Sequence, residues 1–212
     1  MRGILLDLDN TLLDDWHATD EGCRAMLCEY AAADSSASAS VLLDLWRNLL
    51  NLHWQRFEKG EVSFQEQRRC RVRGLLGNDL DDSTADAAFL TYQRAYESAW
   101  RLYPGASEFL DRTREVPKVI VTNGNREMQT RKIHSMLLSS YFVGIVTPDD
   151  CGFWKPSEEI FEAALGLLQL DAAECLMIGD DEAKDIEPAR KLGMHVFHIR
   201  PGANLLDAIA CA

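Results

Sequence analysis

Two aspartates near the start of the chain have the spacing of a catalytic or metal-binding pair. Asp7 and Asp9 flank Leu8 in the sequence Asp7-Leu8-Asp9-Asn10-Thr11, which follows an apolar run that begins at Gly3. In a strand, the two-residue period places both carboxylates on the same side. Two negative charges this close need a positive partner, and Mg²⁺ is the natural candidate for hard oxygen ligands. Taken alone, the pentad is equally compatible with acids that start a turn or cap a helix.

A second acidic cluster follows a later apolar run. Asp180 comes directly after this run, and Asp185 lies a helical turn or so further along the chain. Asp180 is placed to complete a metal site with Asp7, and Asp185 could order a metal-bound water or hold a lysine. The intervening Asp181 and Glu182 are explained as acids in the first turn of a helix, where the helix dipole stabilises them.

Two further motifs could bind an anion. Thr122-Asn123-Gly124 follows an apolar run and offers a hydroxyl, an amide and a flexible backbone whose N–H groups can turn toward an anion. Lys155 precedes Pro156 and an expected helix start at Ser157, and it supplies a positive point charge. Each feature is weak by itself, because a threonine at a strand end is usually a cap and a lone lysine is usually solvated.

These residues stand at the ends of short runs that predict strands. Five runs are rich in Ile, Val, Leu and Met: Gly3–Leu8, Lys118–Thr122, Val143–Thr147, Cys175–Gly179 and His195–Ile199. Runs that are apolar on both faces and separated by helix-length segments indicate a parallel sheet between two helix layers. We therefore expect an α/β, doubly wound, Rossmann-like core. In such sheets, the carboxyl ends of the strands form the active crevice.

The stretch between the first two runs has a helical period instead. It carries three apolar stripes at helical spacing, within residues 23–30, 42–57 and 88–99, and a weaker helix candidate at Phe64–Leu76. Four helices can bury a small core of their own. We therefore expect residues 1–13 and 102–212 to form the α/β catalytic core, and residues 14–101 to form an all-helical cap inserted after the first strand.

Composition and charge disfavour several classes of partner. Of the 212 residues, 47% are apolar, which suffices for a core without disulfide or metal staples. The 22 basic and 34 acidic residues give a net charge of −12, which disfavours nucleic acid and anionic membrane surfaces. The six cysteines show no Cys-x-x-Cys spacing and suit a reducing compartment. We expect a cytoplasmic protein, monomeric or homodimeric, with a small-molecule partner.

Together, in this order and on these elements, the motifs resemble the haloacid dehalogenase superfamily. Within it, they are similar to the small phosphatases whose helical cap is inserted after the first motif. The aspartate pentad and Gly179-Asp180…Asp185 carry the resemblance as a pair, and Thr122-Asn123-Gly124 and Lys155-Pro156 support it. The similarity covers essentially the whole chain, and the nucleotidase and sugar-phosphate phosphatase branches look most similar.

The resemblance implies a role for each matching residue. Asp7 would be the nucleophile that forms an aspartyl-phosphate, and Asp9 would be the general acid and then the base. Three residues would bind the substrate phosphate: Thr122, Asn123 and Lys155. Mg²⁺ would be bound by the Asp7 and Asp180 carboxylates and the Asp9 backbone carbonyl, and Asp185 would support this site. The implied substrate is a small phosphate ester, either a sugar phosphate or a nucleoside monophosphate.

Other activities of the same superfamily fit less well or stay open. Asp9 and Asp180 argue against a dehalogenase, which needs neither a proton donor nor a metal. A phosphonate-cleaving relative would use a cap lysine, and the expected cap has only Lys59. Lys184 and Trp154 depart from the family pattern without removing a catalytic group. A phosphomutase stays open, as does a catalytically degenerate phosphate- or metal-binding module.

Four arginines of the expected cap could contact a second anionic group of the substrate. At 100° per residue they divide into two pairs on different faces, Arg68 with Arg71 and Arg69 with Arg73, so at most one pair could line a cleft. The favoured interpretation is a solvated helix face on which the arginines pair with nearby acids.

Overall fold

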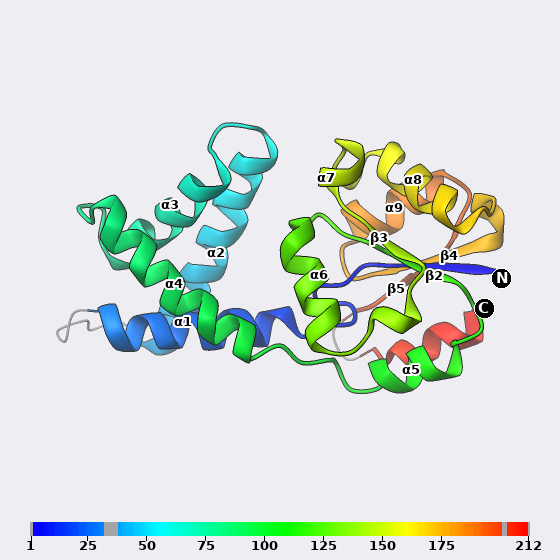
Figure 1. The fold of residues 1–212 in the computed structure, drawn as a ribbon, viewed down its shortest axis with the longest axis horizontal. Coiled ribbons are helices and arrows are strands. Elements are labelled where there is room, and N and C mark those ends of the chain that lie inside the picture. Colours follow the sequence, from blue (N-terminus) through cyan, green and yellow to red (C-terminus); the bar gives the residue numbers. More distant parts are fainter. Residues whose placement is uncertain (1, 32–37, 201–202, 212) are drawn as a thin grey trace. The chain divides into compact units, whose positions relative to one another are not determined.

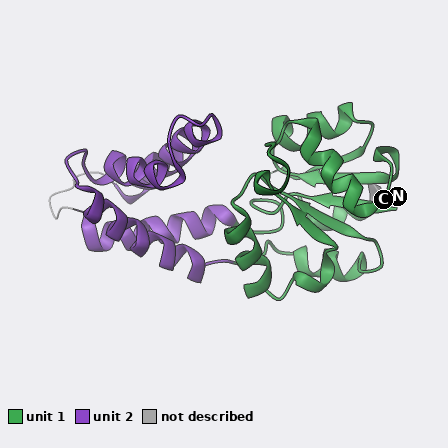
Figure 2. Ribbon diagram, turned by 45° about the horizontal axis from the view of Figure 1, so that its top comes forward, with its two compact units in different colours: residues 1–14, 101–212 green, residues 15–100 purple. Residues whose placement is uncertain are grey.

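The computed structural model describes residues 2–31, 38–200 and 203–211. The chain divides into two compact units, which Figure 2 distinguishes by colour. Unit 1 comprises Met1–Asp14 together with Arg101–Ala212, and unit 2 comprises Asp15–Trp100. Each helix in the described part of the chain is too short or too polar to cross a membrane.

Unit 1, which Figure 1 shows with its helices, is built on a parallel sheet. The sheet has five strands in the order β3-β2-β1-β4-β5. The strands are β1 (Gly3–Leu6), β2 (Lys118–Val121), β3 (Gly144–Val146), β4 (Cys175–Gly179) and β5 (His195–His198). Every expected run forms a strand, although β1 ends before the aspartate pentad rather than running into it. The expected doubly wound α/β core is confirmed.

The strand order places a topological switch point beside β1. The chain adds β2 and β3 on one side of β1 and then crosses to add β4 and β5 on the other. Leu5 of β1 pairs with Val119 of β2 and with Met177 of β4, which fixes the register of the central strands. In open α/β sheets, ligands bind in the crevice outside the carboxyl ends of the strands at such a point.

Helices cover both faces of this sheet (Figure 1). Ile4 and Leu6 of β1 pack in one apolar core with residues of α5 and α6, and Leu5 packs in the opposite core with residues of α8 and α9. Alternate residues of a strand therefore serve both cores, as a fully buried strand requires. The helical elements of unit 1 are α5 (Ala106–Arg112), α6 (Arg126–Ser135), η1 (Ser139–Tyr141), α7 (Pro148–Cys151), α8 (Glu158–Leu168), η2 (Ala172–Glu174), η3 (Glu182–Ile186), α9 (Glu187–Lys191) and η4 (Leu205–Cys211).

Unit 2 consists of four helices with a shared aromatic core. They are α1 (Asp15–Tyr30), α2 (Ala39–Glu58), α3 (Phe64–Leu76) and α4 (Asp82–Ser98). Ser63 and Asp81 cap α3 and α4 by accepting a hydrogen bond from a first-turn N–H. The rings of Trp46 and Tyr92 lie 4.8 Å apart between α2 and α4. Gly22 allows α1 to approach α4 closely, since a Cβ there would lie 2.7 Å from the Tyr92 ring.

The four arginines of α3 separate into the two expected pairs. Arg69 binds Asp86 with two guanidinium nitrogens, at 2.9 and 2.7 Å, and Arg73 forms an ion pair with Asp82. This pair confirms the interpretation of a helix face that pairs with nearby acids. The other pair lies among aromatic rings: Arg68 lies 4.2 Å from the centre of the Phe64 ring, and Arg71 lies 4.4 Å from that of Trp46. Arg71 is only 5% exposed, so the solvated-face interpretation is wrong for this residue.

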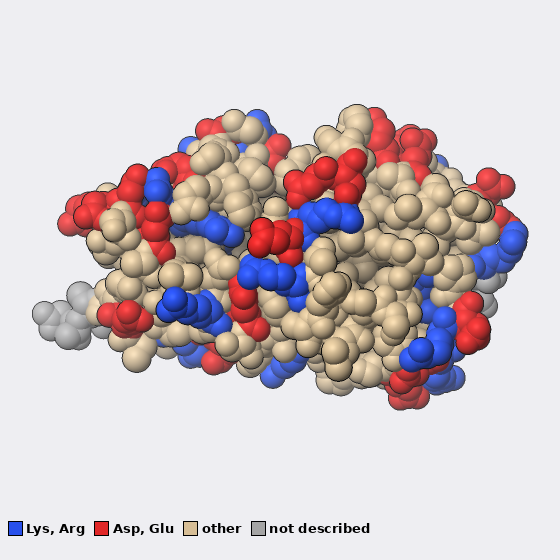
Figure 3. Space-filling model, in the orientation of Figure 1, with Lys and Arg blue, Asp and Glu red and all other residues tan. Residues whose placement is uncertain are grey.

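Charged side chains of both signs are interspersed on the face of the molecule seen in Figure 3. Many charged side chains of the described residues form ion pairs, among them Arg2 with Glu174 at 2.6 Å in unit 1 and Arg47 with Asp20 at 2.5 Å in unit 2. Exposed ion pairs contribute only about 0–1 kcal/mol each. The stability of both units therefore rests mainly on their buried apolar side chains.

Candidate active site

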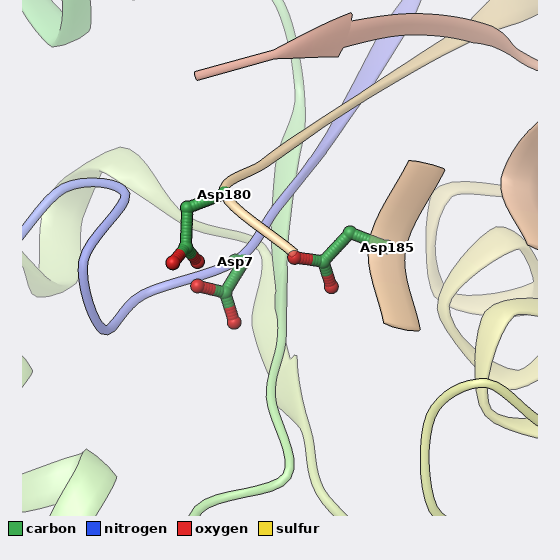
Figure 4. Close-up of side chains that lie close together, drawn as sticks. All are labelled: Asp7, Asp180 and Asp185. Carbon is green, nitrogen blue, oxygen red and sulfur yellow. The ribbon is translucent and has the colours of Figure 1, made fainter. Parts of the chain in front are cut away.

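The carboxyl ends of β1 and β4 bring three carboxylates together. Asp7 follows β1, Asp180 follows β4 and Asp185 belongs to η3. One oxygen from each lies within 4.8 Å of the others, and Figure 4 shows the cluster. The Asp7 N–H donates to the carbonyl of Ile178 at 2.9 Å, so the sheet hydrogen bonding continues to the first acid and aligns the two strand ends.

The turn after β4 positions Asp185. η3 is a π-helix, and Asp181 caps it by accepting from the N–H groups of Ala183 and Lys184 at 2.9 and 3.0 Å. This geometry supports the interpretation of Asp181 as a helix-terminal acid. Asp185 is 1% exposed and lies so close to Gly179 that a Cβ there would be 2.3 Å from its Oδ2. Only glycine therefore fits at this strand end without displacing the carboxylate.

Lys155 bridges two of the three carboxylates. Its Nζ lies 2.7 Å from Asp7 Oδ1 and 2.6 Å from Asp185 Oδ1, and the residue is 5% exposed. Asn123 holds this lysine by its backbone: the Asn123 amide donates to the Lys155 carbonyl at 2.9 Å and accepts from the Lys155 N–H at 2.7 Å. The Asn123 side chain thus positions the lysine.

One lysine does not balance three acids. Burial raises the pKa of Asp7 to about 6, against the opposing effect of Lys155 and with a further contribution from Asp185. Burial and the charges of Asp7 and Asp185 raise the pKa of Asp180 to about 8. Burial tends to lower the pKa of Lys155, but Asp185 and Asp7 raise it above its ordinary value. The surplus negative charge and the all-oxygen donor set fit a hard divalent cation such as Mg²⁺.

Asp9 lies outside this cluster of carboxylates. Its Oδ1 forms an ion pair with Lys132, and its Oδ2 accepts a hydrogen bond from Gln129 Nε2 at 2.6 Å. Both partners belong to α6, where they are three residues apart and therefore on one helix face. Sequence reasoning missed both residues. The only feature of the sequence that could have indicated them is their spacing of three residues on a short polar helix that follows Thr122-Asn123-Gly124.

Thr122 lies at the end of β2, the other neighbour of β1. It is 2% exposed, and its Oγ1 accepts hydrogen bonds from the Gly124 N–H at 3.0 Å and from Gln129 Nε2 at 3.1 Å. Gln129 therefore contacts both Thr122 and Asp9. The predicted site residues accordingly form two groups at the same edge of the sheet: Asp7, Asp180, Asp185, Lys155 and Asn123 in one, and Asp9 and Thr122 in the other.

Comparison with curated proteins finds several phosphatases. Glyceraldehyde 3-phosphate phosphatase of Methanocaldococcus jannaschii is 26% identical over 204 residues, covering 95% of this chain and 86% of that protein. Phosphoserine phosphatase of Thermus thermophilus is 30% identical over 227 aligned positions, covering 95% and 90%. Haloacid dehalogenase-like hydrolase domain-containing protein 3 of Xenopus laevis is 30% identical over 133 residues, so 62% of this chain matches about half of that relative, 53% of its length.

Structural and family comparisons agree with this result. The magnesium-bound crystal structure of the HAD-hydrolase YfnB of Bacillus subtilis has a TM-score of 0.83 at 23% identity, covering 99% of this chain and 97% of that one, and so shares the fold. A family model described as haloacid dehalogenase-like hydrolase matches residues 1–193. The chain therefore belongs to the haloacid dehalogenase-like hydrolases, as the acids at its strand ends indicate.

Proposed function

We propose that this hydrolase is a Mg²⁺-dependent phosphatase that acts on a small phosphorylated metabolite through an aspartyl-phosphate on Asp7. The observation that carries the proposal is the buried cluster in which Lys155 Nζ contacts both Asp7 and Asp185 while Asp180 adds a third carboxylate. This cluster pairs a nucleophile with a phosphate-binding cation. It also keeps surplus negative charge for a metal.

The chemistry divides into two balanced steps. In the first, which begins with Asp9 in its protonated form, an Asp7 oxygen attacks phosphorus, and the bond from phosphorus to the leaving oxygen breaks as Asp9 transfers its proton to that oxygen. In the second, water attacks the phosphorus of the aspartyl-phosphate and gives a proton to Asp9. Inorganic phosphate leaves, and the Asp7 carboxylate is restored.

The proposed binding groups would offset the negative charge of the substrate phosphate and of the carboxylates. Lys155 and the Thr122 hydroxyl would bind phosphate oxygens, and the Asn123 side chain would keep Lys155 in place. Mg²⁺, held by Asp7, Asp180 and the Asp9 carbonyl with Asp185 in support, would neutralise the charge of the phosphate and of the carboxylates. Uncatalysed monoester hydrolysis is extremely slow, with enzymatic accelerations reaching about 10²¹-fold, so each contribution is needed.

The names of the relatives support phosphate-ester hydrolysis, but they do not agree on one substrate. Two of them are named for different esters, glyceraldehyde 3-phosphate and phosphoserine. For this chain we keep the class of sugar phosphates and nucleoside monophosphates. Unit 2 would serve as the cap that selects the leaving group. We further propose a cytoplasmic enzyme that works as a monomer or homodimer; six cysteines without Cys-x-x-Cys spacing support a reducing compartment.

A phosphate-release assay tests the proposal. The purified chain, incubated with a panel of phosphorylated metabolites, is expected to release inorganic phosphate with MgCl₂ and to stop when EDTA is in excess. Asp7→Asn should abolish release, whereas Asp44→Asn, the same chemical change on an exposed face of α2, should leave it unchanged. Interconversion of phosphate esters without inorganic phosphate would identify a mutase instead.

A further inference from the structure

Gln129 is a buried amide that contacts two proposed functional residues at once. It lies on α6, is 1% exposed, and its Nε2 lies 2.6 Å from Asp9 Oδ2 and 3.1 Å from Thr122 Oγ1. An amide nitrogen carries two hydrogens, so both bonds form together. Asp9 is ion-paired with Lys132 as a carboxylate, so the reverse orientation of the amide would set its oxygen against a negative charge. The donor assignment therefore follows from the neighbours.

This contact fixes the direction of the Thr122 hydroxyl. A hydroxyl oxygen has two lone pairs, and here the Gly124 N–H and Gln129 Nε2 both donate to it. Its own hydrogen is then left to point to a third partner. Thr122 is thereby oriented as a donor, which is the role that an oxygen of a substrate phosphate requires.

The same amide restrains Asp9. Gln129 binds Oδ2 and Lys132 binds Oδ1, so two donors from one face of α6 hold opposite oxygens of the carboxylate. A carboxylate held at both oxygens has a fixed plane. For a group that passes a proton to a leaving oxygen, this orientation is a requirement of the reaction.

The surroundings show that the amide occupies a site shaped for it. A Cβ at Gly124 would lie 1.8 Å from Gln129 Nε2, so a side chain at this position would displace the amide. Gln129 Oε1 is buried and finds no hydrogen-bond partner among the described residues. An apolar side chain would fill the same space without an unsatisfied oxygen. An apolar residue could not form the two hydrogen bonds that Gln129 Nε2 donates to Asp9 and Thr122.

We propose that Gln129 is a positioning residue that couples the proton-transfer group Asp9 to the phosphate-binding hydroxyl of Thr122. The inference rests on the proposed phosphatase function. The hydrogen bonds of Gln129 go to Asp9 and Thr122 and not to the cluster of three carboxylates. Its removal should therefore affect phosphate binding and proton transfer while leaving metal binding intact.

The test compares Gln129→Met and Gln129→Glu with the control Glu127→Gln, an exposed position on the same helix. With an alkyl phosphate, we expect Gln129→Met to lower kcat about tenfold or more and to raise KM. With para-nitrophenyl phosphate, whose leaving group scarcely needs a proton, the loss in kcat should be at least about threefold smaller. Gln129→Glu puts an acceptor beside Asp9 and should be more damaging than Gln129→Met.

A double-mutant cycle separates positioning from general damage. In a Thr122→Val background, the effect of Gln129→Met on KM should shrink by about threefold or more, because the hydroxyl it orients is gone. Mg²⁺ affinity, measured by calorimetry, should equal that of the wild type. Equal losses on both esters with additive effects in the cycle would overturn the proposal, as would unchanged kinetic constants.

A wild-type protein that hydrolyses no ester would contradict the phosphatase proposal. In that case, the binding of tungstate, a phosphate analogue, still tests the positioning role by calorimetry. Gln129→Met should weaken tungstate binding by about fivefold or more, and an undiminished affinity would overturn the inference about Gln129.

Discussion

Lys155 supplies a single positive charge against three buried or half-buried carboxylates. It contacts Asp7 and Asp185 directly, while Asp180 accepts a hydrogen bond from the Thr11 hydroxyl at 3.4 Å. The cost of this imbalance appears in the raised pKa values of Asp7 and Asp180. The same imbalance that destabilises the metal-free site is what would attract a divalent cation.

These pKa values predict how stability depends on pH. Both are above 3.8, so the metal-free folded protein binds more protons at these residues than the unfolded chain does. Their contribution to stability is therefore greatest in acid and is lost as pH rises through about 6 for Asp7 and about 8 for Asp180. In EDTA, the melting temperature of the wild type should fall relative to that of Asp180→Asn between about pH 5 and 8.5.

Metal addition provides the control for this prediction. Mg²⁺ binds the ionised carboxylates, so MgCl₂ should stabilise the wild type increasingly as pH rises and should stabilise Asp180→Asn much less. Melting curves by differential scanning fluorimetry at matched ionic strength measure both effects. A wild type that gains stability relative to Asp180→Asn with rising pH in EDTA would show that the carboxylates are not mutually destabilising.

The proposed acid role of Asp9 predicts that the loss of kcat on substitution depends on the leaving group of the ester. Asn at this position keeps the shape and can still accept from Lys132, so Asp9→Asn should fold normally. Without the acid, kcat for an alkyl phosphate should fall by about 10²–10⁴-fold, and for para-nitrophenyl phosphate by much less. Steady-state rates on the two esters measure the difference, and equal losses would remove Asp9 from the proton-transfer role.

Glycine at the end of β4 is what allows η3 to bring Asp185 to Lys155. We predict that Gly179→Ala costs about 1–3 kcal/mol of stability, because the added methyl overlaps a buried carboxylate. Activity should fall at least about tenfold as Asp185 moves away from Lys155. The control is Gly166→Ala on α8, where a Cβ meets open space, and it should stabilise by about 0.5–1 kcal/mol. Urea unfolding measures the stability of both variants. If Gly179→Ala were as stable as Gly166→Ala, Asp185 would not approach Gly179 as closely as the structure shows.

The packing of α1 against α4 gives a matching prediction for unit 2. Gly22→Ala would set a methyl against the ring and backbone of Tyr92 and should cost about 1–3 kcal/mol. Among the nearest atoms, Gly74→Ala would meet only the side chain of Leu49, whose terminal methyl groups can rotate away, and it should be near neutral. Mg²⁺ affinity should be unchanged in both variants, because the three clustered carboxylates all belong to unit 1. A loss of metal binding in either variant would contradict this assignment.

The elements show which features a sequence can predict. Apolar runs on both faces identified all five strands, and the acids beside them located Asp7 and Asp180 at neighbouring strand ends. Gln129 and Lys132 escaped because polar residues three apart on a helix usually mark a solvated face, and only the tertiary fold turns that face onto Asp9. Arg71 escaped for a similar reason: helical spacing grouped it with Arg68 but could not show that aromatic rings bury it.

At the scale of the whole molecule, the proposed catalytic groups belong to a single unit. The described residues proposed for catalysis and for phosphate or metal binding all lie within Met1–Asp14 and Arg101–Ala212. Unit 2 contributes a separate four-helix core with its own aromatic packing. If it serves as the cap, substitutions within it should change which ester is preferred, while the dependence on Asp7 and on metal should stay the same.

Asp7 should become phosphorylated during turnover, and chemical trapping of the aspartyl-phosphate measures this directly. The enzyme is mixed with MgCl₂ and a phosphate ester that it hydrolyses, and the reaction is quenched in acid. Borohydride is then added, which reduces an aspartyl-phosphate to homoserine. Peptide mass spectrometry should then find homoserine at position 7, only when both ester and Mg²⁺ are present. Continued turnover with Asp7 unmodified, or with the modification at another acid, would show that Asp7 is not the nucleophile.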